Sequence, residues 1–216
     1  MSRVKLLGTT QILILSVLFF GCRKKASEEI DFGTFSNSVY TNKYFGVTVT
    51  IPPEWNIQSQ ESQQRLMKTG ARIMAGDDKN FKAIVKASEL QTVNLFTVCE
   101  HPLGAPVPFN SSLLGMAEMV RELPGIKRGK DYLFQMRKTM EGGQIQFSFP
   151  KDVYSEQLGE VEFDVLDSEM KYSGKTIKQK YYSTIKKGYA LCFILSFGTA
   201  DKEVALRKIL DTVAFH

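Results

Sequence analysis

The predicted architecture rests on residues 160–197, which read EVEFDVLDSEMKYSGKTIKQKYYSTIKKGYALCFILSF. Charged and apolar residues alternate from 160 to 165, which is the pattern of a half-buried β-strand. Residues 175–182 and 189–197 are further strand-like runs. The links around Gly174 and Gly188 are turn signals, and they are too short to hold the crossover helix that parallel strands require. An antiparallel sheet is therefore predicted here.

Further strands and helices are predicted on both sides of this stretch. Val47, Val49 and Ile51 alternate with threonines until Pro52-Pro53 ends the strand, because proline cannot donate to a sheet ladder. Other predicted strands are residues 83–87, 95–99, 132–137 and 144–149, and predicted helices are residues 59–75, 111–123 and 201–213. This order predicts an α+β fold with a mainly antiparallel sheet packed between helices. Trp55 is expected to lie at one end of the core rather than to serve as a ligand platform.

The N-terminus has the pattern of a secretory signal. Arg3 and Lys5 precede an apolar run at residues 12–20, and Gly21 and Cys22 follow it. An uncleaved anchor is the alternative, but a bilayer span needs about 20 predominantly apolar residues and this run is shorter. The predicted organisation is a signal peptide over residues 1–21, a polar tether over 22–38 and a single domain over 39–216.

Residues 18–22, LFFGC, resemble the lipobox of bacterial lipoproteins. The resemblance implies that Cys22 is lipidated on its thiol and becomes the N-terminus after cleavage. The expected location is the cell envelope, with a lipid anchor in a membrane. Arg23 stands where an inner-membrane retention signal often places aspartate, so the outer membrane is favoured if the organism has two membranes. Arg23-Lys24-Lys25 either contacts anionic head groups or belongs to a solvated tether.

The charge balance gives no indication of a nucleic-acid partner. The chain has 28 basic and 23 acidic residues. Removal of the signal peptide takes away Arg3 and Lys5 and leaves a modest excess of positive charge. Nucleic-acid binding usually concentrates basic residues on one face, whereas here they are dispersed.

Few residues are suited to catalysis, and the chain is expected not to be an enzyme. The histidines are His101 and His216. A dyad of Cys99 and His101 lacks an identifiable third group to orient the base. Neither a Gly-x-Ser-x-Gly elbow nor zinc-ligand spacing occurs. Cys99 and Cys192 are expected to be buried free thiols, with a disulfide between them as the alternative. No catalytic, cofactor-binding or metal-binding residue is predicted.

Three other motifs have a structural and a functional interpretation. Ser173-Gly174-Lys175-Thr176 ends like a P-loop, but Glu169 occupies the position of the required first glycine, which favours a hairpin turn. Glu160, Glu162 and Asp164 could hold a hard cation or serve acid–base chemistry. Cross-strand pairing with Lys178 and Lys180 on an exposed face is the favoured interpretation. Asp77-Asp78 is interpreted as a solvated helix end rather than a cation site.

Residues 44–55, YFGVTVTIPPEW, together with the strand from Gly188 to Phe197 and the ending ILDTVAF at 209–215, resemble PsbP-like domains. The resemblance implies an antiparallel sheet between helices and a binding or assembly role, and it brings no catalytic residue. The expected function is a membrane-anchored, non-catalytic module for an unknown envelope partner. A lipoprotein that binds a small ligand or metal between sheet and helices is the alternative, followed by an envelope hydrolase.

Overall fold

A computed structural model describes residues 30–172 and 174–216 of the chain. The helices are α1 (Gln60–Ala75), α2 (Lys79–Gln91), α3 (Gly129–Glu141) and α4 (Ala200–Leu210). The strands are β1 (Thr34–Ser36), β2 (Val39–Asn42), β3 (Val47–Thr50), β4 (Asn56–Ile57), β5 (Thr92–Cys99), β6 (Ser112–Met119), β7 (Phe147–Ser148), β8 (Tyr154–Leu158), β9 (Val161–Tyr172), β10 (Lys175–Lys186), β11 (Tyr189–Phe197) and β12 (Ala214–Phe215). The described strands pair antiparallel throughout, which confirms the predicted α+β fold.

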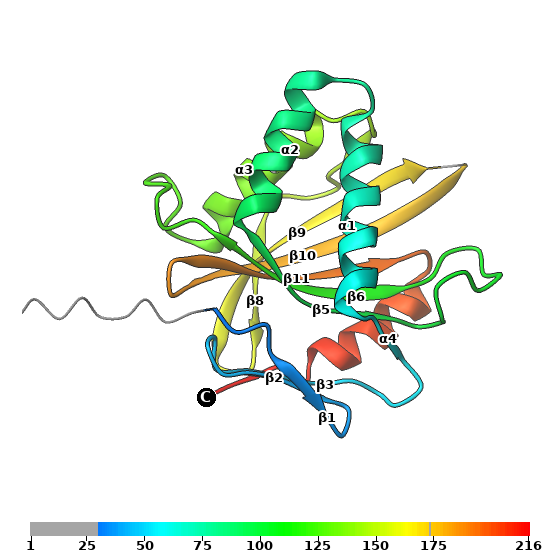
Figure 1. The fold of residues 1–216 in the computed structure, drawn as a ribbon, viewed down its shortest axis with the longest axis vertical. Coiled ribbons are helices and arrows are strands. Elements are labelled where there is room, and N and C mark those ends of the chain that lie inside the picture. The colour runs from blue at the N-terminus through cyan, green and yellow to red at the C-terminus, as the bar shows by residue number, and fades with distance from the viewer. Residues whose placement is uncertain (1–29, 173) are drawn as a thin grey trace, which may run out of the picture.

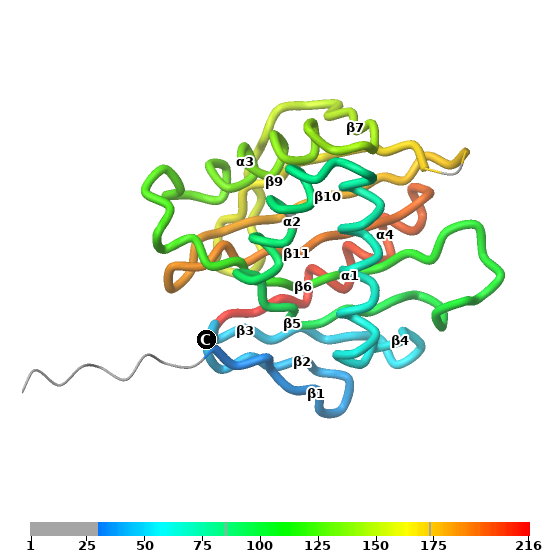
Figure 2. Tube along the Cα trace, turned by 45° about the horizontal axis from the view of Figure 1, so that its top comes forward, coloured from blue at the N-terminus to red at the C-terminus, as the bar shows by residue number. Residues whose placement is uncertain are grey.

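The strands form two sheets. The smaller sheet has the order β1-β2-β3-β12, and the larger has the order β4-β5-β6-β11-β10-β9-β7, with β8 beside β9. At the centre of the larger sheet, Tyr182 of β10 lies opposite Val165 of β9 and Phe193 of β11, as the predicted hairpins require. Figures 1 and 2 show α1, α2 and α3 on one side of this sheet, and α4 with the smaller sheet on the other.

One face of the larger sheet packs against the smaller sheet and α4. Phe163 and Phe193 point into this core, where they join Phe45 and Leu210, and all four are fully buried. Trp55 packs against the same cluster, in line with its expected place at the edge of the core.

The opposite face of the larger sheet packs against the helices α1 to α3. Leu133 of α3, Leu166 of β9 and Cys192 of β11 belong to this second cluster. Because β11 is buried on both faces, its sequence is a nearly continuous apolar run. The run at residues 189–197 is therefore a strand with the predicted bounds.

The prediction of a helix at residues 111–123 is wrong, because β6 occupies most of this segment and pairs with β5 and β11. Leu113 and Ala117 face the smaller sheet, whereas Met116 faces the helices. A strand buried on both faces carries apolar residues on both, and here these residues also fall at helical spacing. Pairing with two neighbouring strands decides the conformation.

The prediction of a strand at residues 83–87 is also wrong, because these residues lie within α2. Asp78 begins this helix: its Oδ1 accepts hydrogen bonds from the Asn80 and Phe81 amides at 2.8 and 2.9 Å. Such a cap satisfies amides that a helix start otherwise leaves unpaired. Asp78 is thus the start of a second helix, and not only the end of the first.

Residues 132–137 are predicted as a strand, and they lie in α3 instead. Asp131 accepts a hydrogen bond from the Arg128 amide at 2.9 Å and so helps to start the helix. Tyr132, Met136 and Met140 recur every fourth residue and pack toward the sheet. This spacing is helical, and it is visible in the sequence once the cap is recognised.

The smaller sheet begins within the segment expected to be a tether. Phe35 of β1 lies opposite Tyr40 of β2, so part of residues 22–38 belongs to the folded domain. Cys22 and the predicted signal peptide lie outside the described residues. No helix in residues 30–172 and 174–216 combines the length and apolar character needed to cross a membrane.

Candidate functional site

A pocket of about 930 Å³ lies between the helices and the larger sheet. Side chains from α1, α2 and α3 form one wall, and side chains from β6, β9 and β10 form the other. Its volume falls in the range of about 300–1,000 Å³ that is typical of small-molecule sites. Ordinary core packing leaves few voids larger than a water molecule. The pocket is therefore a distinct feature of this layer of the fold.

Methionine is unusually concentrated in the wall of this pocket. The chain has eight methionines, and six of them line the pocket: Met67, Met74, Met116, Met136, Met140 and Met170. Methionine is unbranched and polarisable, so it adapts to irregular apolar shapes and is common at surfaces that accept varied ligands. The wall is consequently apolar and deformable.

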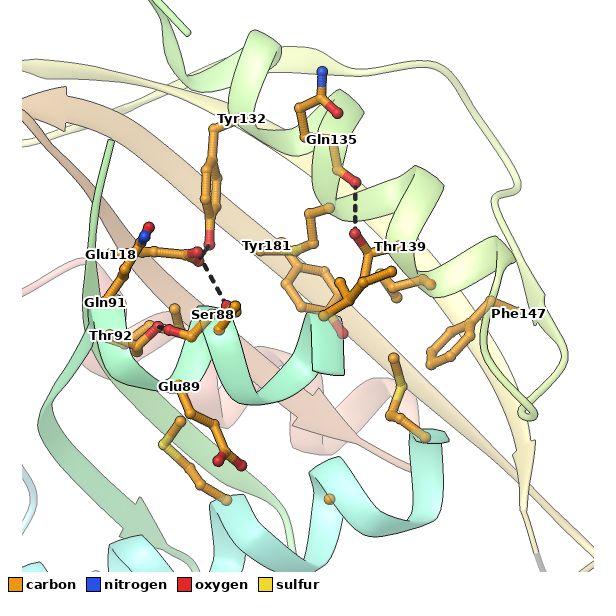
Figure 3. Close-up of a pocket in the computed structure, with 18 of the residues that line it drawn as sticks. Ser88, Glu89, Gln91, Thr92, Glu118, Tyr132, Gln135, Thr139, Phe147 and Tyr181 are labelled. Carbon is orange, nitrogen blue, oxygen red and sulfur yellow. Dashed lines mark hydrogen bonds between the residues drawn. The ribbon is translucent and has the colours of Figure 1, made fainter. Parts of the chain in front are cut away.

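Polar groups gather at one end of the pocket. Glu118 Oε1 accepts a hydrogen bond from Ser88 Oγ at 3.0 Å, and Glu118 Oε2 accepts one from Tyr132 Oη at 2.7 Å. Figure 3 shows Glu118, Ser88 and Thr92 close together, with Phe147 at the opposite end of the pocket. The site therefore has one polar and one apolar end.

The strand register explains why Glu118 faces the pocket. Successive residues of a strand point to opposite faces of the sheet. Leu113 and Ala117 of β6 are buried against the smaller sheet, so the alternate positions Met116 and Glu118 face the helices and line the pocket. Glu118 can therefore be recognised as a pocket residue only when β6 is identified as a strand.

Gly70 of α1 also lines the pocket. A Cβ atom placed on it would meet no other atom within 4 Å. Glycine within a helix costs roughly 0.5–1 kcal/mol relative to alanine, and here no close contact requires it. Its effect is to leave the α1 wall of the pocket open.

Two buried tyrosines supply fixed hydrogen-bond donors near the pocket. Burial raises the pKa of Tyr132 and of Tyr181 well above the usual tyrosine value. Both hydroxyls therefore stay protonated even at alkaline pH, and Tyr181 Oη donates to Gln179 Oε1 at 2.7 Å. The polar groups of the wall are held in place before any ligand arrives.

Cys99 and His101 do not form the arrangement of a nucleophile and its base. The His101 amide donates to Asn110 Oδ1 at 2.9 Å, and His101 Nε2 lies 3.9 Å from Glu100 Oε1. Burial raises the pKa of Cys99 to about 11, the opposite of what an activated thiolate needs. Cys99 and Cys192 are both buried and free, as expected, and not joined by a disulfide.

The charged residues of β9 and β10 form cross-strand pairs, as favoured, but with different partners. Lys178 pairs with Glu169 at 3.3 Å, and Lys180 pairs with Asp167 at 3.2 Å. Asp164 instead accepts a hydrogen bond from the Lys130 amide at the start of α3, at 2.8 Å. Glu160 precedes β9, and Glu162 lies on it. Glu162 and Asp164 alternate with the buried Phe163 and Val165, as expected, whereas Glu160 lies outside the strand.

The structure also shows where the P-loop-like segment lies and whether carboxylate, histidine or cysteine side chains gather at one place. Lys175 and Thr176 begin strand β10, opposite Tyr172 and Lys171 of β9, so they follow a hairpin turn and do not open a phosphate-binding helix. Among the described residues, no group of three or more His, Cys, Asp or Glu side chains could hold a metal ion.

Sequence reasoning anticipated a cleft between sheet and helices only as an alternative, and it identified none of the residues that form the polar end. These residues come from segments far apart in the chain, and they lie on three elements, α2, β6 and α3, that were all predicted wrongly. One signal was available: six methionines lie between residues 67 and 140, more than the rest of the chain contains.

No protein-family model and no curated protein matches this chain. Among solved structures, it is similar to the cyanobacterial PsbP of Synechocystis sp. PCC 6803, with a TM-score of 0.49, 12% identity, and 85% of this chain and 96% of that chain covered. LpqN of Mycobacterium tuberculosis, involved in cell envelope biogenesis, gives a TM-score of 0.39 at 13% identity over 77% of this chain and 78% of that chain. Protein PA94 of unknown function from Pseudomonas aeruginosa gives 0.42 at 15% identity over 58% of this chain and 81% of that chain. These similarities say nothing about a ligand or partner.

Proposed function

We propose that this chain is a lipid-anchored envelope protein whose domain binds an apolar small molecule, without catalysis, in the pocket between α1–α3 and the larger sheet. The observation that carries the proposal is a cavity of about 930 Å³ whose wall contains six methionines. Ligand sites are typically concave and mostly apolar, with a few polar groups that fix orientation. Glu118, Ser88 and Tyr132 are such polar groups here.

Binding rather than chemistry is supported by the state of the ionisable groups around the pocket. Burial raises the pKa of the Cys192 thiol to about 12, which makes it a poor nucleophile at neutral pH. Tyr132 remains protonated and donates to Glu118. This hydrogen-bonded pair is therefore in place to orient a ligand.

The anchor is proposed from the sequence at Cys22. The mass of the mature N-terminal peptide, measured on protein from membranes of the native host, tests it directly. We expect an acylated peptide that begins at Cys22, and its loss in a Cys22→Ala variant. An unmodified or uncleaved N-terminus contradicts the anchor. Fractionation of the same membranes tests the prediction of outer-membrane sorting that follows from Arg23.

Filling the pocket from α1 tests the binding function. In Gly70→Trp the indole projects from a position with open space around it, so the helix is retained while the cavity is occupied. Thr69→Trp is the matched control, because Thr69 is exposed on the same helix and does not line the pocket. The readout is the fluorescence of N-phenylnaphthylamine, an apolar probe that becomes bright in a dry environment.

We expect saturable probe binding by the wild type and by Thr69→Trp, and its loss in Gly70→Trp at a melting temperature no lower than that of the wild type. Equal binding by both tryptophan variants would show that the probe binds elsewhere and would contradict the proposal. Assembly with an envelope protein stays a prediction from the sequence, which cross-linking in intact cells can test.

A further inference from the structure

We propose that the ligand of this pocket is an amphiphile with a cationic head group, held at Glu118, with its apolar chain directed toward Phe147. The inference rests on the proposed binding function and deepens it by naming the chemical class of the ligand. It follows from three features of the polar end: the charges of the lining residues, the orientation of α2, and the hydrogen bonds of Glu118.

The charges in the pocket wall all have one sign. Of the described residues that line the pocket, two are carboxylates, Glu89 and Glu118, and none is lysine, arginine or histidine. An anionic head group would be desolvated beside these carboxylates without a counter-charge, which is unfavourable. A cationic head group would provide the counter-charge that the wall lacks.

Helix α2 points its C-terminus at the same end of the pocket. Ser88, Glu89 and Gln91 lie in its last turn and line the pocket, and this turn contains no basic residue. The C-terminus of a helix carries the negative end of the helix dipole, so it favours cations. Thr92 already donates to the Ser88 and Glu89 carbonyls, so the helix contributes here through its dipole. A basic side chain near a helix C-terminus often provides this favourable charge, and here a cationic ligand would provide it.

Glu118 is held in position and still has capacity to accept hydrogen bonds. Its oxygens each accept one hydrogen bond, from Ser88 and from Tyr132. An ionised carboxylate offers about four lone-pair sites, so roughly two remain for a ligand. An ammonium group brings three donors, and hydrogen bonds between ionised partners are about twice as strong as neutral ones.

The far end of the pocket suits an apolar chain. Figure 3 shows the pocket running from Glu118 past Tyr181 and Thr139 to Phe147. Burial of each methylene group on an apolar wall contributes about 0.8 kcal/mol. The chain thus supplies affinity, and the charge at Glu118 selects the head group.

Three ligands of equal chain length separate head-group charge from apolar burial. Dodecylamine is a cation at pH 7, dodecanol is neutral and dodecanoate is an anion. Each is added below its micellar concentration to displace N-phenylnaphthylamine from the wild-type protein. We expect dodecylamine to bind about tenfold or more tighter than dodecanoate, with dodecanol in between.

The Glu118→Gln variant then tests the residue. It keeps a similar shape while removing the charge, so we expect the preference for dodecylamine over dodecanoate to disappear and dodecanol affinity to change little. Glu122→Gln is the control, because Glu122 is a nearby exposed carboxylate outside the pocket wall. It should keep the wild-type preference.

The outcomes distinguish the inference from the function on which it rests. If dodecanoate binds the wild type as tightly as dodecylamine while the probe still binds, the cationic ligand is excluded and the apolar binding site stands. Loss of the preference in Glu122→Gln as well would remove the role of Glu118. If neither the probe nor any of the three ligands binds, the proposed function itself is wrong.

Discussion

The packing of the larger sheet against the smaller sheet depends on single residues, and Gly115 is an example. It lies on β6, where a Cβ atom would come within 2.5 Å of Phe96 Cε1. Phe96 is fully buried and lies 4.7 Å from Tyr40 and 6.2 Å from Phe193, measured between ring centroids. The glycine is therefore required by packing, in contrast to Gly70, which has open space around it.

Gly115→Ala is expected to destabilise the protein by about 1–3 kcal/mol, the usual effect of overpacking a filled core. The free energy of unfolding in urea is the measurement. Gly198→Ala serves as the control, since the nearest atom to its added Cβ, Phe109 Cβ, lies at 3.8 Å, an ordinary contact distance. If both variants are as stable as the wild type, the described packing of Phe96 is incorrect.

At the scale of elements, the predictions succeeded where one local signal was sufficient. The start of α1 is marked by Ser59, whose Oγ accepts from the Ser62 amide at 3.3 Å, and the period of the helix follows from there. The hairpins of β9, β10 and β11 are set by alternation and by the glycine turns between them. Such signals act within a few residues, so they can be recognised in the sequence.

The same scale shows why β6, α2 and α3 were predicted wrongly. β6 is a strand because it pairs on both sides, with β5 and with β11, and these partners are remote in sequence. α2 and α3 begin at Asp78 and near Asp131, whose hydrogen bonds to backbone amides start a helix although the apolar residues that follow also suit a strand. These three elements supply Ser88, Glu118 and Tyr132 at the polar end of the pocket, so this end does not follow from the predicted elements.

A substitution at Gly70 of helix α1 is expected to change the stability of the protein without filling the pocket. Gly70→Ala removes the conformational freedom of glycine without a clash, so the free energy of unfolding should rise by about 0.5–1 kcal/mol. Thermal or urea unfolding measures the change. A decrease in stability would show that Gly70 has a structural role, and it would contradict the interpretation that this glycine serves to keep the pocket open.

At the scale of the whole molecule, the larger sheet is buried on both faces, and this burial determines the response to alkali. Burial raises the pKa of Cys192 from 9.0 to about 12 and that of Cys99 from 9.0 to about 11. Burial likewise raises the pKa of Tyr40, Tyr181 and Tyr182. Each group stays neutral in the fold at a pH at which it ionises in the unfolded chain.

Stability should therefore fall as the pH rises from about 9 toward 12. Below pH 9 these groups are neutral in both states, so their contribution is fully present there, and it is lost as unfolding releases protons. Urea unfolding at a series of pH values measures the effect. The fall should be shallower in Cys192→Ala than in the wild type, and equal slopes would contradict the assignment to this thiol.

The central claim, an apolar ligand site between the helices and the larger sheet, can be tested most directly through the methionines themselves. With isotope-labelled methionine methyl groups, nuclear magnetic resonance follows each one during a titration with N-phenylnaphthylamine, whose ring shifts nearby methyl signals. The six pocket methionines should shift together and saturate, while Met119, which is 38% exposed and outside the pocket, should not. A shift confined to Met119, or no shift among the six, would contradict the account.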